Sequence, residues 1–120
     1  MINYKPTLVE KLNELFEGKY PVVAEDFLTA STELPAISYF LSTDAVRANG
    51  DEFGYSDIYF NIKVWDRKIG VMEEIASQID TMMRSLGFTR IAVNELWFDG
   101  LGQKELRYQG LARELFSKGD

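Results

Sequence analysis

Carboxylates gather around one polar stretch of the chain, Ser42–Gly54, and carboxylate oxygens are the ligands that calcium prefers. The Asp-x-Asp-x-Asp-Gly spacing of an EF-hand loop is missing, however. A solvated loop accounts for these side chains equally well, so no metal site is predicted. The carboxylates concerned are Asp44, Asp51, Glu52 and Asp57.

A second acidic group, Glu73, Glu74 and Asp80, lies in a segment with helical periodicity. The two glutamates stand near the predicted start of that helix, where the helix dipole stabilises negative charge, so general acid–base catalysis is not needed to explain them. The sequence has no histidine and no cysteine, which excludes Ser–His and Cys–His nucleophile pairs and a His-ligated metal. We therefore predict no enzymatic activity and no cofactor.

Glycines, methionines and arginines offer further candidates, and each has a structural explanation. Gly100-x-Gly102 joins two predicted strands and is a turn, whereas a phosphate cradle leads from a strand into a helix. Met72, Met82 and Met83 fall on the apolar side of a predicted helix and are expected to fill the core. Four arginines would bind an anion if gathered together, but pairing with acidic neighbours across strands or subunits explains them as well. They are Arg84, Arg90, Arg107 and Arg113.

Hydrophobic periodicity indicates the elements that carry these residues. A helix is predicted at Thr7–Glu17, with a capping-box pattern from Thr7 to Glu10, and a longer helix from Val71 to Leu86. The element order α-β-β-β-α-β-β predicts a single α+β domain over residues 1–120, a mostly antiparallel sheet with two helices packed on one face. The predicted strands are Tyr20–Phe27, Ala36–Leu41, Ser56–Lys68, Thr89–Phe98 and Lys104–Phe116.

Composition narrows the class of protein. A chain of 120 residues with 46% hydrophobic residues has the size of one domain and is not disordered throughout. Its formal net charge of -6 argues against non-specific binding to nucleic acid or to an anionic membrane surface, since both need clustered Lys and Arg. No apolar run approaches the roughly 20 residues of a membrane span. Glu10 and Lys11 stand where a signal peptide would be apolar, and the lack of cysteine fits a cytoplasmic protein.

The segment Ser56–Lys68 alternates between two kinds of side chain, which is the pattern of a strand with one buried face. The opposite parity carries Tyr59 and Trp65 at positions where Lys, Glu or Thr would be ordinary. We expect these two rings to lie bare on an isolated protomer and to be covered by another molecule. The apolar parity consists of Ile58, Phe60, Ile62 and Val64.

Aromatic side chains are expected on the exterior of the sheet elsewhere as well. Aromatic residues and arginines are enriched where proteins meet. Because only two helices are available to cover a sheet whose faces are both partly apolar, the sequence predicts a homo-oligomer. The aromatic residues concerned are Tyr55, Tyr59, Trp65, Trp97 and Tyr108.

Four short stretches occur in a recognisable order along the chain. A short opening helix precedes P-A-I-S-Y at Pro35–Tyr39, and a long polar loop leads into a strand that ends V-W-D-R-K at Val64–Lys68. The long helix then ends L-G-F at Leu86–Phe88, and the closing strand carries K-E-L-R-Y-Q-G at Lys104–Gly110. Over most of its length the chain resembles the tail terminator, or tail-completion, proteins of long-tailed bacteriophages and their prophage relatives.

The resemblance implies a structural α+β protein without enzymatic activity, which assembles as a ring, typically hexameric, at the head-proximal end of the tail tube. Such a ring stops polymerisation of the tube and offers a surface to the head. The implied partners are further copies of the chain, the tail tube protein and a head-completion or neck protein. Assembly is implied to take place in the host cytoplasm, and the finished protein belongs to the virion tail. The acidic charge suits a channel through which DNA slides without sticking.

Contacts with these partners are assigned to two regions and the closing strand. The strand Ser56–Lys68 offers one patch for a neighbouring subunit. The segment Ser42–Gly54 is either a hairpin with a loose tip or a loop that orders on docking. The candidate contact residues are Tyr55, Tyr59, Trp65, Arg47, Asp51, Phe53, Arg107 and Tyr108.

Two other classes remain open on the sequence. The first is another phage neck protein or a minor tail component of similar size. The second is a dimeric cytoplasmic ligand-binding or regulatory domain built on a ferredoxin-like sandwich, which would need a pocket with a few convergent polar groups. An enzyme ranks behind both, because histidine and cysteine are missing.

Overall fold

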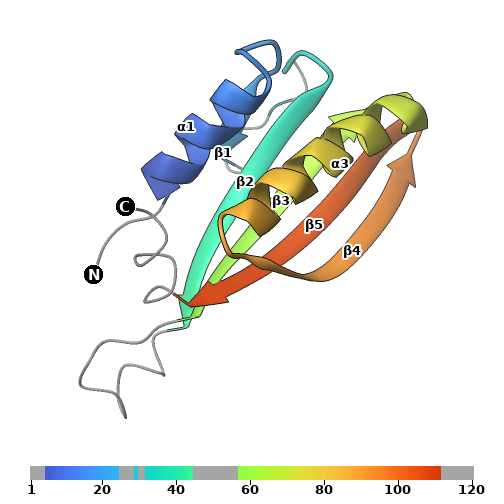
Figure 1. Ribbon diagram of the computed structural model, residues 1–120. Coiled ribbons are helices and arrows are strands. Elements are labelled where there is room, and N and C mark those ends of the chain that lie inside the picture. Colours follow the sequence, from blue (N-terminus) through green and yellow to red (C-terminus); the bar gives the residue numbers. More distant parts are fainter. Residues whose placement is uncertain (1–4, 25–28, 30–31, 45–56, 112–120) are drawn as a thin grey trace.

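A computed structural model gives the fold of the chain and describes residues 5–24, 29, 32–44 and 57–111 (Figure 1). The element order α-β-β-β-α-β-β and the α+β class predicted from the sequence are confirmed. The elements are α1 (Lys5–Leu15), β1 (Val22–Ala24), β2 (Ala36–Asp44), β3 (Asp57–Asp66), α3 (Ile69–Ser85), β4 (Thr89–Phe98) and β5 (Leu101–Leu111).

The strands form one five-stranded sheet in the order β1-β2-β3-β5-β4. β1 pairs with β2 in parallel, and the three other pairings are antiparallel. Both helices lie on the same side of the sheet, with α1 over the β1–β2 side and α3 over β3 and β5 (Figure 1). β4 lies at the edge of the sheet beyond α3, so the two helices do not cover the sheet to its end.

The core lies between the two helices and one face of the sheet. The alternation predicted for β3 is confirmed, because its apolar parity is buried from Ile58 through Val64. Facing positions of the neighbouring strands continue the same layer: Ile37 of β2 pairs with Val64, and Leu106 of β5 pairs with Ile62. The helices complete the core with Leu8, Leu12, Phe16, Met72, Ile75, Ile79 and Met83. The methionines of α3 are therefore packing residues, as predicted.

Several boundaries differ from the prediction. α1 begins at Lys5, so Thr7 lies within the helix and the predicted capping box is wrong. The stop near Gly18 is confirmed: Gly18 has a φ of 73° and its N–H donates to the carbonyl oxygen of Asn13 at 3.0 Å. β1 begins at Val22 and not at Tyr20, the predicted end of this strand lies outside the described residues, and β2 is longer than predicted. The hairpin turn between β4 and β5 is Asp99-Gly100 alone, both with positive φ, and Gly102 belongs to β5.

Gly102 allows two side chains to approach the backbone of β5 closely. A Cβ atom built there would stand 2.6 Å from Cε of Met72 and 2.8 Å from Cη2 of Trp97. We expect Gly102→Ala to lower the free energy of unfolding by about 1–3 kcal/mol, because both side chains must leave their packed positions. Denaturant unfolding measures the loss. Gly70→Ala is the matched control, because no atom lies within 4 Å of its added methyl group. A Gly102→Ala protein as stable as the wild type would contradict this packing.

Candidate interaction surfaces

The side of the sheet opposite the helices has no covering layer among the described residues. We call it the open face. Strand register places alternate residues of β2, β3, β5 and β4 on it, in rows such as Trp65–Gln103–Leu96. The side chains on the open face are of mixed character and include Phe40, Tyr59, Asn61, Trp65, Leu96 and Arg107.

The open face is partly apolar. Phe40 and Leu96 are each 51% exposed, although both are large hydrophobic residues on a sheet surface. A hollow of about 310 Å³ lies at one end of the face and is lined by Phe40, Tyr59, Asn61 and Arg107, among others. Oδ1 of Asn61 is buried there without a hydrogen-bond partner in the described part of the chain. Exposed rings beside an unsatisfied acceptor are features of a surface that binds another molecule.

Polar side chains cross the middle of the open face. Nδ2 of Asn94 donates to Oε1 of Glu105 at 3.0 Å, and the register places Lys63 next to Glu105 on the adjacent strand. Arg107 is exposed in the following row, opposite Asn61. The face therefore combines a polar centre with apolar ends, which gives it two kinds of contact for a partner.

The rings of Tyr59 and Trp65, which were expected to be covered by another molecule, are each half-buried. Nε1 of Trp65 donates to Oγ of Ser38 at 2.9 Å, and Ser38 is fully buried. Nε2 of Gln109 donates to the hydroxyl of Tyr59 at 3.4 Å. Neighbouring strands thus hold both rings against the sheet. The expectation that both rings lie bare is therefore wrong. Neither ring is fully enclosed by its own chain, however.

Removing the Trp65–Ser38 hydrogen bond is expected to lower the stability of the protein. We expect Ser38→Ala to lower the free energy of unfolding by about 1 kcal/mol, because the indole N–H loses its acceptor. In a Trp65→Phe background the same change should cost much less, since no donor remains to be satisfied. Unfolding of the two single variants and the double variant completes the cycle. Equal effects of Ser38→Ala in both backgrounds would show that this contact contributes nothing.

The predicted contact residues have different outcomes. Arg107 is exposed on the open face, together with the partly exposed Tyr59 and Trp65. The prediction that Tyr108 lies on the exterior is wrong: Tyr108 is 0% exposed under α3, opposite Phe60 on the helix side of the sheet. Tyr108 stands two residues after Leu106 and therefore faces the same side of the strand. This shared parity with an aliphatic residue was the sequence signal for a core position. Four predicted contact residues lie outside the described residues: Arg47, Asp51, Phe53 and Tyr55.

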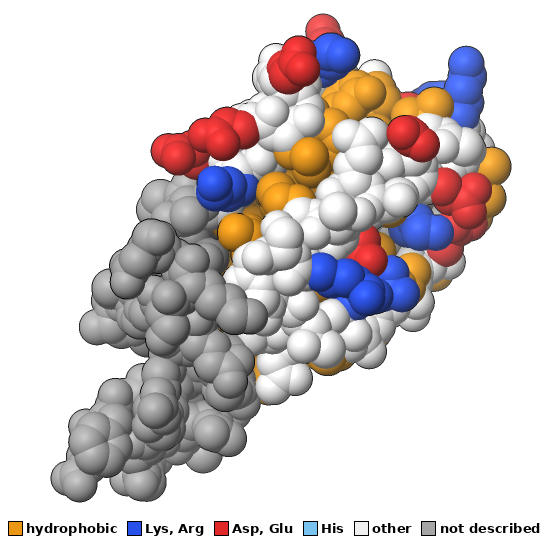
Figure 2. Space-filling view, viewed as in Figure 1, with side chains coloured by type: hydrophobic (Ala, Val, Ile, Leu, Met, Phe, Trp, Pro, Cys, Tyr) orange, Lys and Arg blue, Asp and Glu red, His pale blue; other side chains and the backbone are white. Residues whose placement is uncertain are grey.

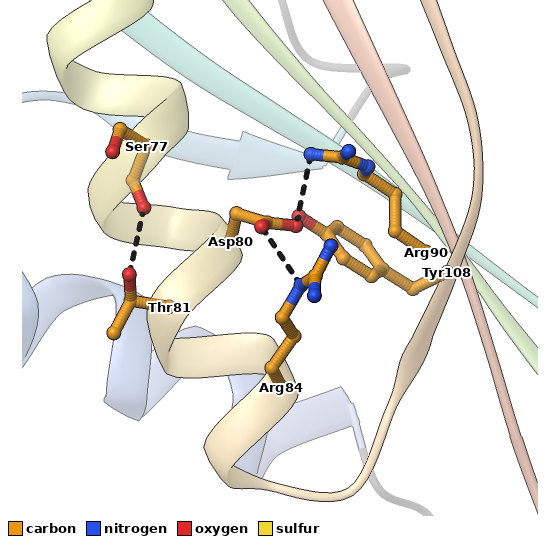
Figure 3. Close-up of polar contacts among 6 residues, drawn as sticks. All are labelled: Ser77, Asp80, Thr81, Arg84, Arg90 and Tyr108. Atoms are coloured by element: carbon orange, nitrogen blue, oxygen red, sulfur yellow. Dashed lines mark hydrogen bonds and ion pairs between the residues drawn. The ribbon is translucent and has the colours of Figure 1, made fainter.

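The hydroxyl of Tyr108 belongs to a polar cluster that ties α3 to β4 and β5 (Figure 3). Oδ1 of Asp80 accepts a hydrogen bond from the Tyr108 hydroxyl at 2.8 Å and lies 3.4 Å from Nη1 of Arg90. Oδ2 of Asp80 lies 2.9 Å from Nε of Arg84. Burial, and then the hydrogen bond and charge of Asp80, raise the pKa of Tyr108 well above its ordinary value. Arg84 and Arg90 thus balance an acidic neighbour, but that neighbour lies on α3 and not across strands or subunits as predicted.

β4 is an edge strand with unusual exposure. All but one of its ten residues are exposed. Five of the eight exposed large hydrophobic residues in the described chain lie in β4: Ile91, Val93, Leu96, Trp97 and Phe98. A long, apolar and uncovered edge is a template for pairing with a further strand, and natural proteins usually protect such edges. Sequence analysis predicted the strand but not its edge position, because strand order is not visible in periodicity.

A groove of about 450 Å³ separates α3 from β4 on the helix side of the sheet. Ala76, Val93 and Leu106 give it an apolar floor, and Asp80, Arg90 and Lys104 are among its polar walls. Figure 2 shows basic and acidic side chains lying next to one another on this side of the molecule. The charged walls are largely paired within the chain, which does not favour the groove as a small-ligand pocket.

Glu95 connects the outer end of the groove to the edge strand. Its Oε2 accepts a hydrogen bond from Nε1 of Trp97 at 2.9 Å, and its Oε1 lies 3.5 Å from Nζ of Lys104. The indole hydrogen bond, and next the nearby Lys104 charge, lower the pKa of Glu95 despite some desolvation. These contacts hold the Trp97 ring in place beside Gly102.

The described residues contain no cluster of three or more Asp or Glu arranged to hold a metal ion. The predicted loop carboxylates Asp51 and Glu52 lie outside them. Within the same residues, no helix is long and apolar enough to cross a membrane. Compared with known proteins, the chain matches no family model and no curated protein sequence. Any functional proposal therefore depends on the two surfaces described above, the open face and the β4 edge.

Proposed function

We propose that this protein is a structural component of a phage or prophage tail that closes the head-proximal end of the tail tube as a ring of identical subunits. The ring ends polymerisation of the tube and presents a surface to a head-completion or neck protein. The chain assembles in the host cytoplasm and remains in the virion tail. It performs no catalysis and needs no cofactor.

The observation that carries this proposal is the amount of apolar surface that one protomer leaves uncovered. The open face and the β4 edge together expose large hydrophobic side chains, with Leu96 and Phe98 of β4 on the open face and Val93 and Trp97 on its helix side. Contiguous exposed apolar surface on a small protein marks a site of association. Two distinct surfaces also suit a ring, in which each subunit needs one surface for its neighbours and another for the tube beneath.

Charge agrees with this role. The whole chain has a formal net charge of -6, so a ring of such subunits would repel rather than bind the DNA that passes through it. Arg90, which lines the groove, and Arg84 are both engaged by Asp80. Direct phosphate binding by this cluster would require breaking those ion pairs.

Native mass spectrometry over a range of protein concentrations tests the proposed assembly. We expect a closed species of about six subunits, with few intermediates, because a ring gains its last interface only on closure. A protomer that stops at a discrete dimer would favour the regulatory-domain alternative. A protein that stays monomeric at all concentrations, and on addition of the tail tube protein, would contradict the proposal.

A further inference from the structure

We propose that subunits join edge to edge, with β4 of one copy pairing antiparallel with β1 of the next copy. This inference rests on the proposed ring, and it names the surface and the partner for the contact between subunits. The occupant of the β4 edge is a second copy of this chain. Three features of the described residues carry the inference: the unequal edges, the strand directions and the gap in the helix layer.

The sheet has two edges with different properties. β4 offers ten residues with both sides of the strand exposed, and β1 is a three-residue strand with partly exposed side chains. Among the described residues β4 pairs only with β5, and β1 only with β2. An unpaired edge carries backbone N–H and C=O groups whose natural partners are those of another strand. A contact between one long and one short edge is head-to-tail, and head-to-tail contacts form a ring when the rotation between copies closes.

Strand directions favour this contact. β2 runs parallel to β1, β3 antiparallel to β2, β5 antiparallel to β3, and β4 antiparallel to β5. β4 therefore runs opposite to β1. If the sheet continues from one copy into the next with the same face upward, β4 meets the neighbouring β1 as an antiparallel pair. Antiparallel pairing is the commoner and slightly more stable arrangement for adjacent strands.

The helix layer is incomplete where the contact would form. α1 lies over β1 and α3 over β3 and β5, whereas the groove beside α3 leaves Val93 of β4 42% exposed. Because α1 covers β1, the proposed pairing carries the neighbouring α1 to this side of β4. It would thus cover the groove and its apolar floor.

Charged side chains would also meet across this contact. The exposed surface of α1 and its C-terminal turn carries Glu10, Glu14 and Glu17. The groove side of the partner carries Arg84 and Arg90, whose side chains are 59% and 37% exposed and already pair with Asp80, so the glutamates of α1 would approach them from their solvent side. Acidic residues meeting basic residues steer association and disfavour the reverse docking, in which like surfaces would meet.

Disulfide trapping tests the pairing directly, since the natural chain has no cysteine. Val23 of β1 faces the open side of the sheet, as do Ala92, Asn94 and Leu96 of β4. The experiment combines Val23→Cys with a cysteine at each of these three positions in turn, so that three neighbouring registers are sampled. Two cysteines bond only when their Cα atoms come within about 7 Å, so strand neighbours on one face qualify. Val93→Cys, which faces the helix side, is the matched parity control.

We expect a ladder of covalent oligomers, up to a closed ring, from at least one of the three same-face pairs, and none from the pair Val23→Cys with Val93→Cys. Single variants should give no ladder. A strong covalent dimer from Leu96→Cys alone would overturn the inference in favour of a symmetric β4–β4 contact. Rings seen by native mass spectrometry without any ladder would overturn the edge pairing but leave the proposed function standing. Absence of any oligomer, also on addition of the tail tube protein, would contradict both.

Discussion

Replacing Asp80 with alanine is expected to lower the free energy of unfolding by about 2–3 kcal/mol. One carboxylate links three elements: it accepts the Tyr108 hydroxyl at 2.8 Å and pairs with Arg84 and Arg90. Tyr108 is 0% exposed, so without Asp80 its hydroxyl has lost its acceptor in a buried setting. A buried donor without a partner costs about 1–3 kcal/mol. The partly exposed arginines add less, because solvent screens their ion pairs.

Denaturant unfolding with a double-mutant cycle separates these contributions. Tyr108→Phe alone should cost about 1 kcal/mol, and Asp80→Ala should cost less in the Tyr108→Phe background than in the wild type. Glu73→Ala, an exposed position on the same helix, is the control and should change stability by no more than about 0.5 kcal/mol. An Asp80→Ala protein as stable as the Glu73→Ala control would show that the cluster does not hold α3 to the sheet.

The second large effect concerns assembly. The double variant Leu96→Lys with Phe98→Lys is expected to weaken self-association at least about 100-fold while leaving the protomer folded. Both side chains are exposed on β4, 51% and 64% respectively, so the isolated protomer loses little burial. Burying each one at a subunit contact would contribute about 1.5–3 kcal/mol, and every 1.4 kcal/mol changes an association constant tenfold. Lysines on an edge strand are also a natural device against strand pairing.

Analytical ultracentrifugation measures this loss, and circular dichroism with thermal unfolding confirms the fold. Glu74→Lys is the matched control, since it makes the same change in net charge at an exposed position of α3. We expect the control to keep the oligomer. If the edge variant and the control assemble equally well, the β4 edge is not a subunit contact. If the edge variant unfolds, the exposed side chains of β4 contribute to the protomer in a way that the fold does not indicate.

Local patterns predicted much of this fold. Alternation from Ile58 to Val64 predicted the buried face of β3, and the three- and four-residue spacing through Met72 and Ile79 predicted α3. These patterns reflect whether each side chain faces water or the core, and this alternation repeats with a fixed period along a single helix or strand. Segments without strong periodicity were predicted less well: β1 begins at Val22, two residues after the predicted start of that strand.

Strand order and edges could not be predicted in this way. The last two strands form a hairpin, but periodicity does not say that β5 enters between β3 and β4 and leaves β4 outside. Consequently the exposure of Val93 and Leu96 was missed, and so was the role of Asp80, whose partner Tyr108 is distant in sequence. Tyr108 was placed wrongly for a different reason. Its aromatic ring was interpreted as a contact with a partner, although its position in the strand alternation indicated the core.

The candidate contact surface was predicted in part. Tyr59, Trp65 and Arg107 all lie on the open face, which alternation along β3 indicated. Phe40 was missed, although its parity in β2 is opposite to that of the buried Ile37. A phenylalanine on the polar parity of a strand is a local signal for an exposed apolar position, and it was available in the sequence.

The proposal that this chain stops the growth of a tail tube is tested most directly by the length distribution of tubes. The tail tube protein of the same phage or prophage would be polymerised alone, with the wild-type chain, and with the variant Leu96→Lys plus Phe98→Lys, and the tubes measured by electron microscopy. We predict that the wild-type chain shortens the tubes and decorates a single end, and that the edge variant does neither. Tubes of unchanged length with no density at either end in the presence of the wild-type chain would contradict the account.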